Sequence, residues 1–310
     1  MKNAIIKNKA PVTIFIFNRT DTLDLVFKSI GEYKPDEIFV IADGPRKGIE
    51  GDQKNCLIAR KKAEEHINWE CKIHHNYSDI NLGLGRRIKS GLDWVFSLVD
   101  YSIILEDDCI PASSFYYYCE ELLLKYKDDA RIMHISGNNY TPQYNPDYGS
   151  YFYSKYGHIW GWATWARAWG LMDYEMQHWG TIKSRQALRS LFSLKEYKYL
   201  KKVFDTYFLD VKNPWGIRWF YSRMINNGLS IVPNKNLVTN IGIIGTHSDK
   251  KSSAHFREVD FDFVIDSHPE FVIADSKYDR LHFKKAIYKR RLLIIRILRK
   301  TGRIVKSLLK

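Results

Sequence analysis

The sequence lacks the cysteine pairs and long apolar runs that mark several classes of protein. Only 4 of the 310 residues are cysteine, and none has the short paired spacing of a zinc or redox site. Such isolated cysteines are typical of reduced core thiols in a cytosolic protein. No window approaches about 18 uninterrupted apolar residues, so no membrane-spanning helix is expected. The opening MKNAIIKNKAP also lacks the apolar stretch and cleavage site of a signal peptide.

Acidic residues are absent from the C-terminal segment 284–310, which contains eleven Lys and Arg. The whole chain has 48 Lys and Arg against 35 Asp and Glu, a formal net charge of +13. Removing the eleven cations of the tail leaves a net charge of +2 for residues 1–283. A basic surface supplies most non-specific affinity for nucleic acid, but here the main body is close to neutral. No nucleic-acid partner is therefore expected.

The residues that are present predict a folded α/β protein. The chain is 45% hydrophobic and 15% aromatic, which excludes a mainly disordered protein. Short apolar runs alternate with helical patterns as far as residue 140, and the runs read as strands at 12–17, 37–42, 71–74 and 101–105. This alternation predicts a Rossmann-like, mostly parallel sheet with helices on both faces.

After residue 140 this alternation stops. Residues 140–158 are rich in Tyr, Pro, Asn and Gly and predict a long loop. Seven of the nine tryptophans lie between Trp160 and Trp219. Further patterns predict helices around 185–206 and 216–227 and a short strand at 229–232.

Polar side chains follow directly after three predicted strands, as Asn18-Arg19, Asp43-Gly44-Pro45-Arg46 and Glu106-Asp107-Asp108. Ligands of open α/β sheets bind beyond the carboxyl ends of the strands. Adjacent carboxylates repel one another unless a cation neutralises them, and oxygen ligands suit Mn²⁺ or Mg²⁺. One aspartate as a helix cap is the alternative; the shared edge with Arg19 and Asp43 favours the metal site.

Gly83 and Gly85 open a predicted helix but do not complete a dinucleotide-binding fingerprint, because a third glycine is missing. The amides at the start of the helix, with Arg86 and Arg87, form one candidate site for an anionic group. An ordinary tight turn with two solvated arginines is an equal alternative.

The ordered motifs IFIFNR, IADGPR, NLGLG and ILEDDC resemble nucleotide-sugar glycosyltransferases of the GT-A fold, over about residues 11–250. The chain is most similar to bacterial family-2-like nucleotide-diphospho-sugar transferases, and also to the N-acetylglucosaminyltransferase I family, whose metal motif is likewise Glu-Asp-Asp. The resemblance implies one GT-A domain with a nucleotide-sugar-binding half, residues 1–140, and an acceptor-binding half, residues 141–283. Residues 284–310 follow as a tail.

The same resemblance implies roles for individual residues. Asp108 would ligate the metal, while Glu106 and Asp107 would contact the ribose or the sugar. His247 would complete the metal shell or bind a phosphate, although a lone surface histidine is an alternative. The remaining nucleotide-sugar contacts would come from Arg19 and Asp43 at the nucleobase, and from Asn81 and Arg86 along the nucleotide and sugar.

The segment WGWATWARAW resembles the acceptor-side Gly-Trp motif of these enzymes. Tryptophan faces pack well against sugars, and Trp160, Trp162 and Trp215 are expected to line the acceptor site, with most other tryptophans in the core. An inverting transfer also needs a carboxylate base. No carboxylate occurs between residues 211 and 231, where relatives carry one, which leaves Asp210 and then Asp173 as candidates. Both have a structural cap as the alternative role.

The tail places its apolar residues on one helical face, at Ile287, Ile294, Leu298, Val305 and Leu309. Such a basic amphipathic helix is typical of a segment that lies on an anionic membrane surface. A docked helix with a basic outer face and an RNA-binding tail are the alternatives.

These expectations combine into one hypothesis, a metal-dependent glycosyltransferase with Mn²⁺ or Mg²⁺ as cofactor. It would transfer a hexosyl or N-acetylhexosaminyl group from a nucleotide-diphosphate sugar, expected to be a UDP-sugar, to a cell-surface glycan or lipid-linked acceptor. We expect inversion at the sugar and a cytoplasmic enzyme held peripherally on the inner face of the membrane. The alternatives are a sugar-phosphate nucleotidyltransferase, which lacks support in a Gly-rich basic loop after the first strand, and a non-catalytic membrane- or nucleic-acid-binding module.

Overall fold

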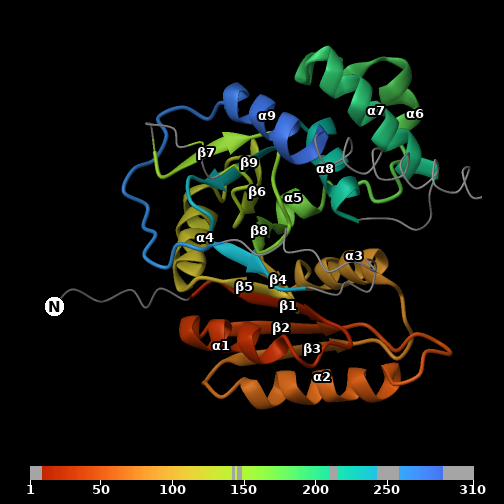
Figure 1. The fold of residues 1–310 in the computed structure, drawn as a ribbon, viewed down its shortest axis with the longest axis vertical. Coiled ribbons are helices and arrows are strands. Elements are labelled where there is room, and N and C mark those ends of the chain that lie inside the picture. Colours follow the sequence, from red (N-terminus) through yellow and green to blue (C-terminus); the bar gives the residue numbers. More distant parts are fainter. Residues whose placement is uncertain (1–8, 142–143, 145–148, 210–214, 243–257, 289–310) are drawn as a thin grey trace, which may run out of the picture.

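An eight-stranded sheet runs through both halves of the chain in the computed structural model (Figure 1). The structure describes residues 9–141, 144, 149–209, 215–242 and 258–288. The strand order is β3-β2-β1-β4-β8-β6-β9-β7. The sheet therefore joins the strands predicted in the first 140 residues to strands of the tryptophan-rich half.

The first half of the sheet is parallel, as predicted. Its strands pair side by side in one direction and comprise β1 (Val12–Ile16), β2 (Glu37–Ala42), β3 (Lys72–Tyr77) and β4 (Tyr101–Glu106). Consecutive residues of β1, β2 and β4 pack on opposite faces, which is why these strands are nearly continuous apolar runs, whereas the edge strand β3 is exposed or half-buried. Ile14 lies in one core cluster and Phe15 in the other.

The second half of the sheet is mixed. β8 (Trp162–Trp165) runs antiparallel to both β4 and β6 (Ile132–Ser136), while β9 (Leu229–Pro233) is parallel to β6. The edge strand β7 (Tyr151–Ser154) is antiparallel to β9. The prediction of a loop throughout 140–158 is wrong at β7, because all four of its residues are buried and leave no polar alternation to read.

Helices cover both faces of the sheet, which confirms the predicted α/β class. One core cluster holds side chains of α1 (Leu23–Tyr33), α2 (Asp52–His66) and α4 (Ser113–Lys125). The other holds side chains of α3 (Leu84–Val95), α5 (Ala166–Trp169) and α8 (Trp215–Ile225). A small second sheet pairs β5 (Cys109–Pro111) with β10 (Val238–Asn240).

A helical layer packs beyond α8 around a third cluster of aromatic and aliphatic side chains. It consists of α6 (Trp179–Ser184), the 3₁₀ helix η1 (Ala187–Leu191), α7 (Leu194–Leu209) and the π-helical turn η2 (Phe283–Tyr288). The helix before η2, α9 (Ser276–His282), places Tyr278 in a separate cluster with Phe152 and Val232. Ile287 of the predicted tail packs on this cluster, and residues 289–310 lie outside the described residues. No helix among those described has both the length and the apolar character needed to cross a membrane.

Candidate functional site

A cavity of about 310 Å³ lies at the carboxyl ends of β1, β2 and β4. Because these strands are parallel neighbours, the polar residues that follow them meet at one edge, as the sequence predicted. Its lining brings together six of the predicted site residues, namely Arg19, Asp43, Asn81, Glu106, Asp107 and Asp108. The structure shows their common location; their individual roles remain predictions.

Asp43 ties the end of β2 to the loop before α3. Its Oδ1 accepts hydrogen bonds from the backbone N–H of Gly44 at 2.9 Å and of Leu82 at 2.9 Å. Its Oδ2 accepts from the N–H of Gly83 at 3.0 Å and from Asn81 Nδ2 at 3.2 Å. Only 6% of Asp43 is exposed, so this carboxylate shapes the cavity wall through four donors.

Arg19 bridges the two aspartates at the end of β4. Its Nη1 lies 3.2 Å from Asp108 Oδ2, and its Nε lies 3.6 Å from Asp107 Oδ1. The N–H of Phe17 donates to Asp107 Oδ2 at 3.1 Å. The residues that follow β1 therefore supply both positive charge and a backbone donor to the carboxylates that follow β4.

This one guanidinium does not neutralise the acidic cluster. Burial raises the pKa of Glu106 to about 8, with a further contribution from the negative charge of Asp108. Burial and then the Asp108 charge also raise the pKa of Asp107 to about 7. A carboxyl group holds its proton near neutral pH only where its charged form is poorly compensated. The edge is thus short of positive charge.

Asp108 is also held from the second sheet. Asn240 on β10 donates from Nδ2 to Asp108 Oδ1 at 2.8 Å, and the N–H of Gly242 donates to Asn240 Oδ1 at 3.0 Å. A Cβ at Gly242 would overlap Asp108 Oδ2 and come within 2.8 Å of Arg19 Nη1. Sequence reasoning missed Asn240 and Gly242, because only the β5–β10 pairing brings them to the cluster.

The donor set suits a cation shared with a ligand better than a cation enclosed by protein. Within the described residues no group of three His, Cys, Asp or Glu side chains is arranged to hold a metal. Mg²⁺ in proteins is commonly held by one or two carboxylates together with substrate phosphates and water. Asp108, which lines the cavity and has 15% of its side chain exposed, fits that arrangement.

Asn18 and Arg46, which the sequence analysis named after the first two strands, also line the cavity, and both are held by Asp52, which it missed. Asp52, in the first turn of α2, accepts from Arg46 Nε at 2.6 Å and from Asn18 Nδ2 at 2.7 Å. The Arg46 hydrogen bond is the main reason that the pKa of Asp52 is lowered. Arg46 also lies 5.4 Å from the centre of the Phe17 ring. The Gly-Pro-Arg turn after β2 was the available signal, but its partner Asp52 is visible only in the fold.

Arg87, and not the predicted Arg86, lines the cavity. Arg86 is exposed, whereas Arg87 is buried and donates from Nε to the carbonyl of Ala42 at 3.1 Å and from Nη2 to Asn76 Oδ1 at 2.7 Å. The predicted role of Arg86 along the nucleotide and sugar stays a prediction, while Arg87 is the arginine of α3 that the structure places in the cavity lining.

Two of the three predicted acceptor-site tryptophans are core residues. Trp162 is 0% and Trp215 is 2% exposed, and their ring centres lie 5.6 Å apart in the cluster beneath α3 and α8. Their predicted sugar contact is therefore corrected, since neither offers a face to solvent. Trp160 is half-buried, with its ring centre 5.5 Å from that of Tyr140, and its acceptor role stays a prediction.

Asp173 does not reach the strand-end cavity. It lies in the lining of a separate surface cavity of about 640 Å³, and its carboxylate accepts from the N–H of Gln177 at 2.9 Å and of His178 at 3.3 Å. These two bonds to backbone N–H groups correspond to the structural cap that was the alternative role for Asp173. The other base candidate, Asp210, and the metal candidate His247 lie outside the described residues.

Comparisons with known proteins leave the family open. No protein-family model and no curated protein matches the chain. A structure described as a putative glucose-1-phosphate thymidylyltransferase from Bacillus anthracis, in complex with sucrose, is 11% identical, with a TM-score of 0.32 over 53% of this chain and 74% of that one. HddC from Yersinia pseudotuberculosis, complexed with GMP-PN, is 10% identical, with a TM-score of 0.30 over 51% of this chain and 77% of that one. Likeness at this level does not identify an activity.

Proposed function

We propose that the strand-end cavity binds the nucleotide-diphosphate part of an activated sugar and that the protein is a metal-dependent glycosyltransferase. The observation that carries this proposal is the undercompensated acidic cluster beside Arg19 at the carboxyl ends of parallel strands. A cluster of this kind accepts a divalent cation readily, and a diphosphate group supplies the remaining oxygen ligands.

The described residues have separate tasks in this proposal. Asp108 would hold Mn²⁺ or Mg²⁺, which supplies compensation for charge on the leaving diphosphate when bound. Arg19 orients Asp108 through its 3.2 Å ion pair. Asp43 fixes the loop at Asn81, while Asp52 fixes Arg46 and Asn18 on the wall where the nucleobase would lie.

The acceptor and the base belong to the second half of the chain. Trp160 remains the candidate sugar platform. Asp210 is the candidate base of an inverting transfer, because Asp173 has its carboxylate engaged as a cap away from the cavity. A glycan or lipid-linked acceptor would account for the basic tail 284–310, which we propose contacts an anionic membrane.

A sugar-phosphate nucleotidyltransferase is the second candidate. The description of the Bacillus anthracis structure matches this activity better than glycosyl transfer, although its TM-score of 0.32 is too low to decide between them. Both activities need a nucleotide, a sugar and a cation at the same strand edge. They differ in the bond that breaks, so the released product separates them.

The test incubates the full chain with a panel of nucleotide-diphosphate sugars and Mn²⁺ and measures the product. Nucleoside diphosphate released in the presence of metal, and lost in Asp108→Ala, supports the glycosyltransferase. Release or uptake of pyrophosphate favours the nucleotidyltransferase. Asp79→Ala is a matched control on an exposed aspartate outside the cavity lining and should behave as the wild type. If no donor is either bound or turned over, both proposals are wrong.

A further inference from the structure

One face of α7 carries lysine and leucine side chains into solvent. Leu194, Lys195, Lys198, Lys202 and Leu209 are all exposed, and their spacing of three, four or seven residues places them on one side of the helix. The opposite side is buried in the third cluster through Tyr197, Leu200 and Phe204. We call the exposed side, defined by the five residues first named, the outer face of α7.

The outer face has an excess of positive charge. Residues 179–209 contain seven Lys and Arg but only two acidic residues, Glu196 and Asp205. Glu196 is 4% exposed and accepts from the N–H of Ser193 at 2.9 Å, so it points away from this face. Asp205 is paired with Lys183 at 2.6 Å and Lys201 at 3.6 Å.

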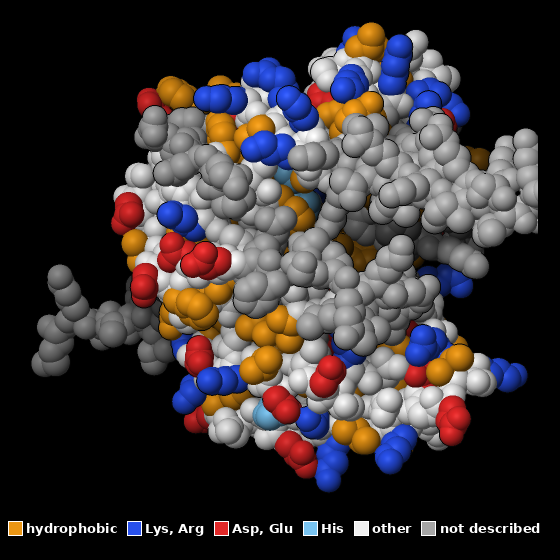
Figure 2. Space-filling view, viewed as in Figure 1, with side chains coloured by type: hydrophobic (Ala, Val, Ile, Leu, Met, Phe, Trp, Pro, Cys, Tyr) orange, Lys and Arg blue, Asp and Glu red, His pale blue; other side chains and the backbone are white. Residues whose placement is uncertain are grey.

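Lys198 and Lys202 consequently have no acidic partner among the residues described. In Figure 2, Lys and Arg side chains gather at the top of the view, over the region of α6, α7 and α9. The near-neutral charge of residues 1–283 thus hides a positive patch on the helical layer.

Apolar side chains stand among these lysines. Leu209 is 79%, Leu194 51% and Phe208 44% exposed at the surface of the same helix. Exposed leucines beside lysines are typical of helices that lie in a lipid headgroup layer. A single-stranded nucleic-acid surface gains affinity mainly from several aromatic stacking platforms, whereas the strongly exposed apolar side chains described on α7 are two leucines and one aromatic ring, Phe208.

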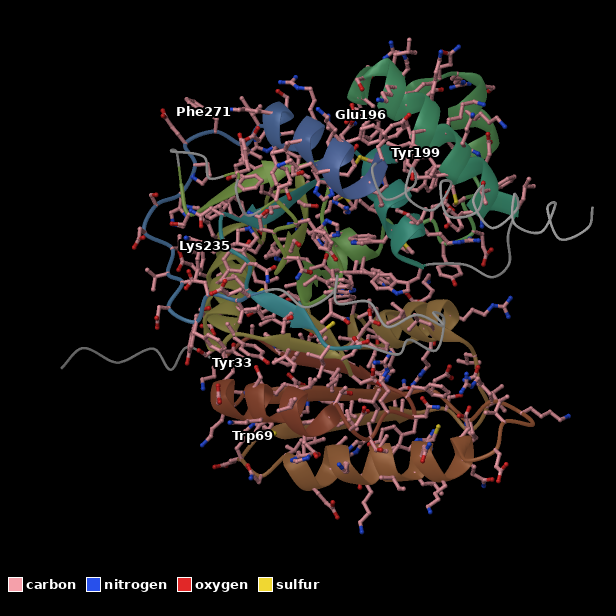
Figure 3. All side chains as sticks on the ribbon, in the orientation of Figure 1. Tyr33, Trp69, Glu196, Tyr199, Lys235 and Phe271 are labelled. Atoms are coloured by element: carbon pink, nitrogen blue, oxygen red, sulfur yellow. The ribbon has the colours of Figure 1, made fainter. Side chains whose placement is uncertain are left out.

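The described chain also ends beside α7. The Phe283 ring centre lies 5.5 Å from that of Tyr199, which Figure 3 labels on α7. The Nζ of Lys195 lies 4.1 Å from the centre of the Tyr288 ring. In the sequence, the next residues, 289–310, contain nine Lys and Arg and no Asp or Glu.

We propose that the outer face of α7 is itself a docking surface for an anionic lipid membrane. The lysines attract acidic headgroups, and Leu194 and Leu209 enter the boundary between headgroups and acyl chains. This surface is built from folded residues of the enzyme body, so it goes beyond the proposed role of the tail. It does not depend on the reaction at the strand-end cavity.

The test compares full-length proteins by co-sedimentation with phosphatidylcholine vesicles, with and without phosphatidylserine. The variant Lys198→Glu/Lys202→Glu keeps the tail and reverses two charges of the outer face. The matched control, Lys28→Glu/Lys54→Glu, makes the same change in net charge on exposed lysines of α1 and α2. Each Lys or Arg near an anionic membrane adds to the favourable free energy of binding. Reversing the charge of two lysines should therefore weaken vesicle binding by about tenfold or more.

The expected result is phosphatidylserine-dependent binding of the wild type that the control retains and that the α7 variant shows about tenfold or more weakly, with equal melting temperatures. Equal binding by the α7 variant and the wild type, or equal loss in both variants, would overturn the proposal. Wild-type binding that ignores phosphatidylserine would also overturn it, as would α7-dependent binding of single-stranded RNA without vesicle binding. Donor turnover in solution, measured on the same samples, separates failure here from failure of the proposed reaction.

Discussion

The strand-end cavity and the helical layer differ in where their charged side chains lie relative to solvent. At the cavity, carboxylates are buried or half-buried and held by fixed partners, as the buried Asp43 is by four donors and the half-buried Asp108 by Arg19 and Asn240. In the layer around α7, aromatic side chains fill the interior and the lysines stand in solvent. Charge kept in a poorly solvated place is costly to maintain, so it indicates a ligand there. Charge that is exposed on the outer side of a helix indicates a surface that contacts a partner.

The largest expected effect comes from removing a buried aromatic side chain of the core. Trp219 is 1% exposed, contacts Trp162 and Trp169, and donates from Nε1 to His134 Nδ1 at 3.2 Å. Trp219→Ala should lower the free energy of unfolding by about 4 kcal/mol, because it leaves a large cavity in the core. Leu209→Ala, at a position 79% exposed, should change it by no more than about 0.5 kcal/mol. Urea unfolding of both variants checks the pair, and similar losses would show that Trp219 is not a core anchor.

The second prediction concerns the pH dependence of stability and Asp279, a buried carboxylate of α9 that is 1% exposed. Burial outweighs its hydrogen bond from Ser154 and its ion pair with Lys155, and raises its pKa from 3.8 to about 6. The folded state therefore holds a proton that the unfolded state has already lost. Stability from this proton is complete below about pH 4 and is lost as pH rises through 6.

The change between those pH values amounts to about 3 kcal/mol for the wild type. Asp279→Asn removes this titration, so its curve of unfolding free energy against pH should be flatter between pH 4 and 6. Denaturant unfolding at closely spaced pH values measures both curves. Parallel curves would show that Asp279 does not carry the pH dependence.

The third prediction disturbs the cavity without touching a charged residue. Gly242→Ala adds a methyl group that would overlap Asp108 Oδ2 and crowd Arg19. Displacing Asp108, the carboxylate proposed to hold the metal, should weaken Mn²⁺-dependent nucleotide binding by about tenfold to a hundredfold. Gly180→Ala, in α6, is the matched change, since its added methyl group meets nothing within 4 Å. Calorimetric titration distinguishes them, and unchanged affinity in Gly242→Ala would argue against this placement of Asp108.

The smallest expected effect tests whether Asp52, Arg46 and Asn18 form the part of the cavity that contacts the nucleobase. Asp52→Asn removes the charge that holds Arg46 and Asn18, and nucleotide affinity should fall by about tenfold. The loss should differ between nucleobases, because these residues would face the base. Asp24→Asn, which breaks an exposed ion pair with Lys62, should leave affinity unchanged. A uniform loss with every nucleotide would place Asp52 away from base recognition.

Three strands of the parallel half, β1, β2 and β4, were readable because each is a nearly continuous apolar run followed by polar residues. The meeting of Arg19, Asp43 and Asp108 followed from strand direction alone. Asn240 and Asp52 could not be foreseen, since they reach the cavity through tertiary contacts of β10 and α2. Trp162 and Trp215 were misassigned because the residue type alone does not show whether a tryptophan is buried in the core or exposed to a sugar. Only their packing in the folded protein shows that both are buried.

The most direct measurement is a calorimetric titration of the full chain with nucleoside diphosphates, with and without Mn²⁺. We expect saturable binding of one diphosphate per chain that needs the metal, disappears in Asp108→Ala and persists in Asp173→Ala. Such a result would assign the ligand to the strand-end cavity and exclude the surface cavity at Asp173. Binding that is equal in wild type and Asp108→Ala, or absent with every nucleotide and metal concentration, would contradict the proposed function.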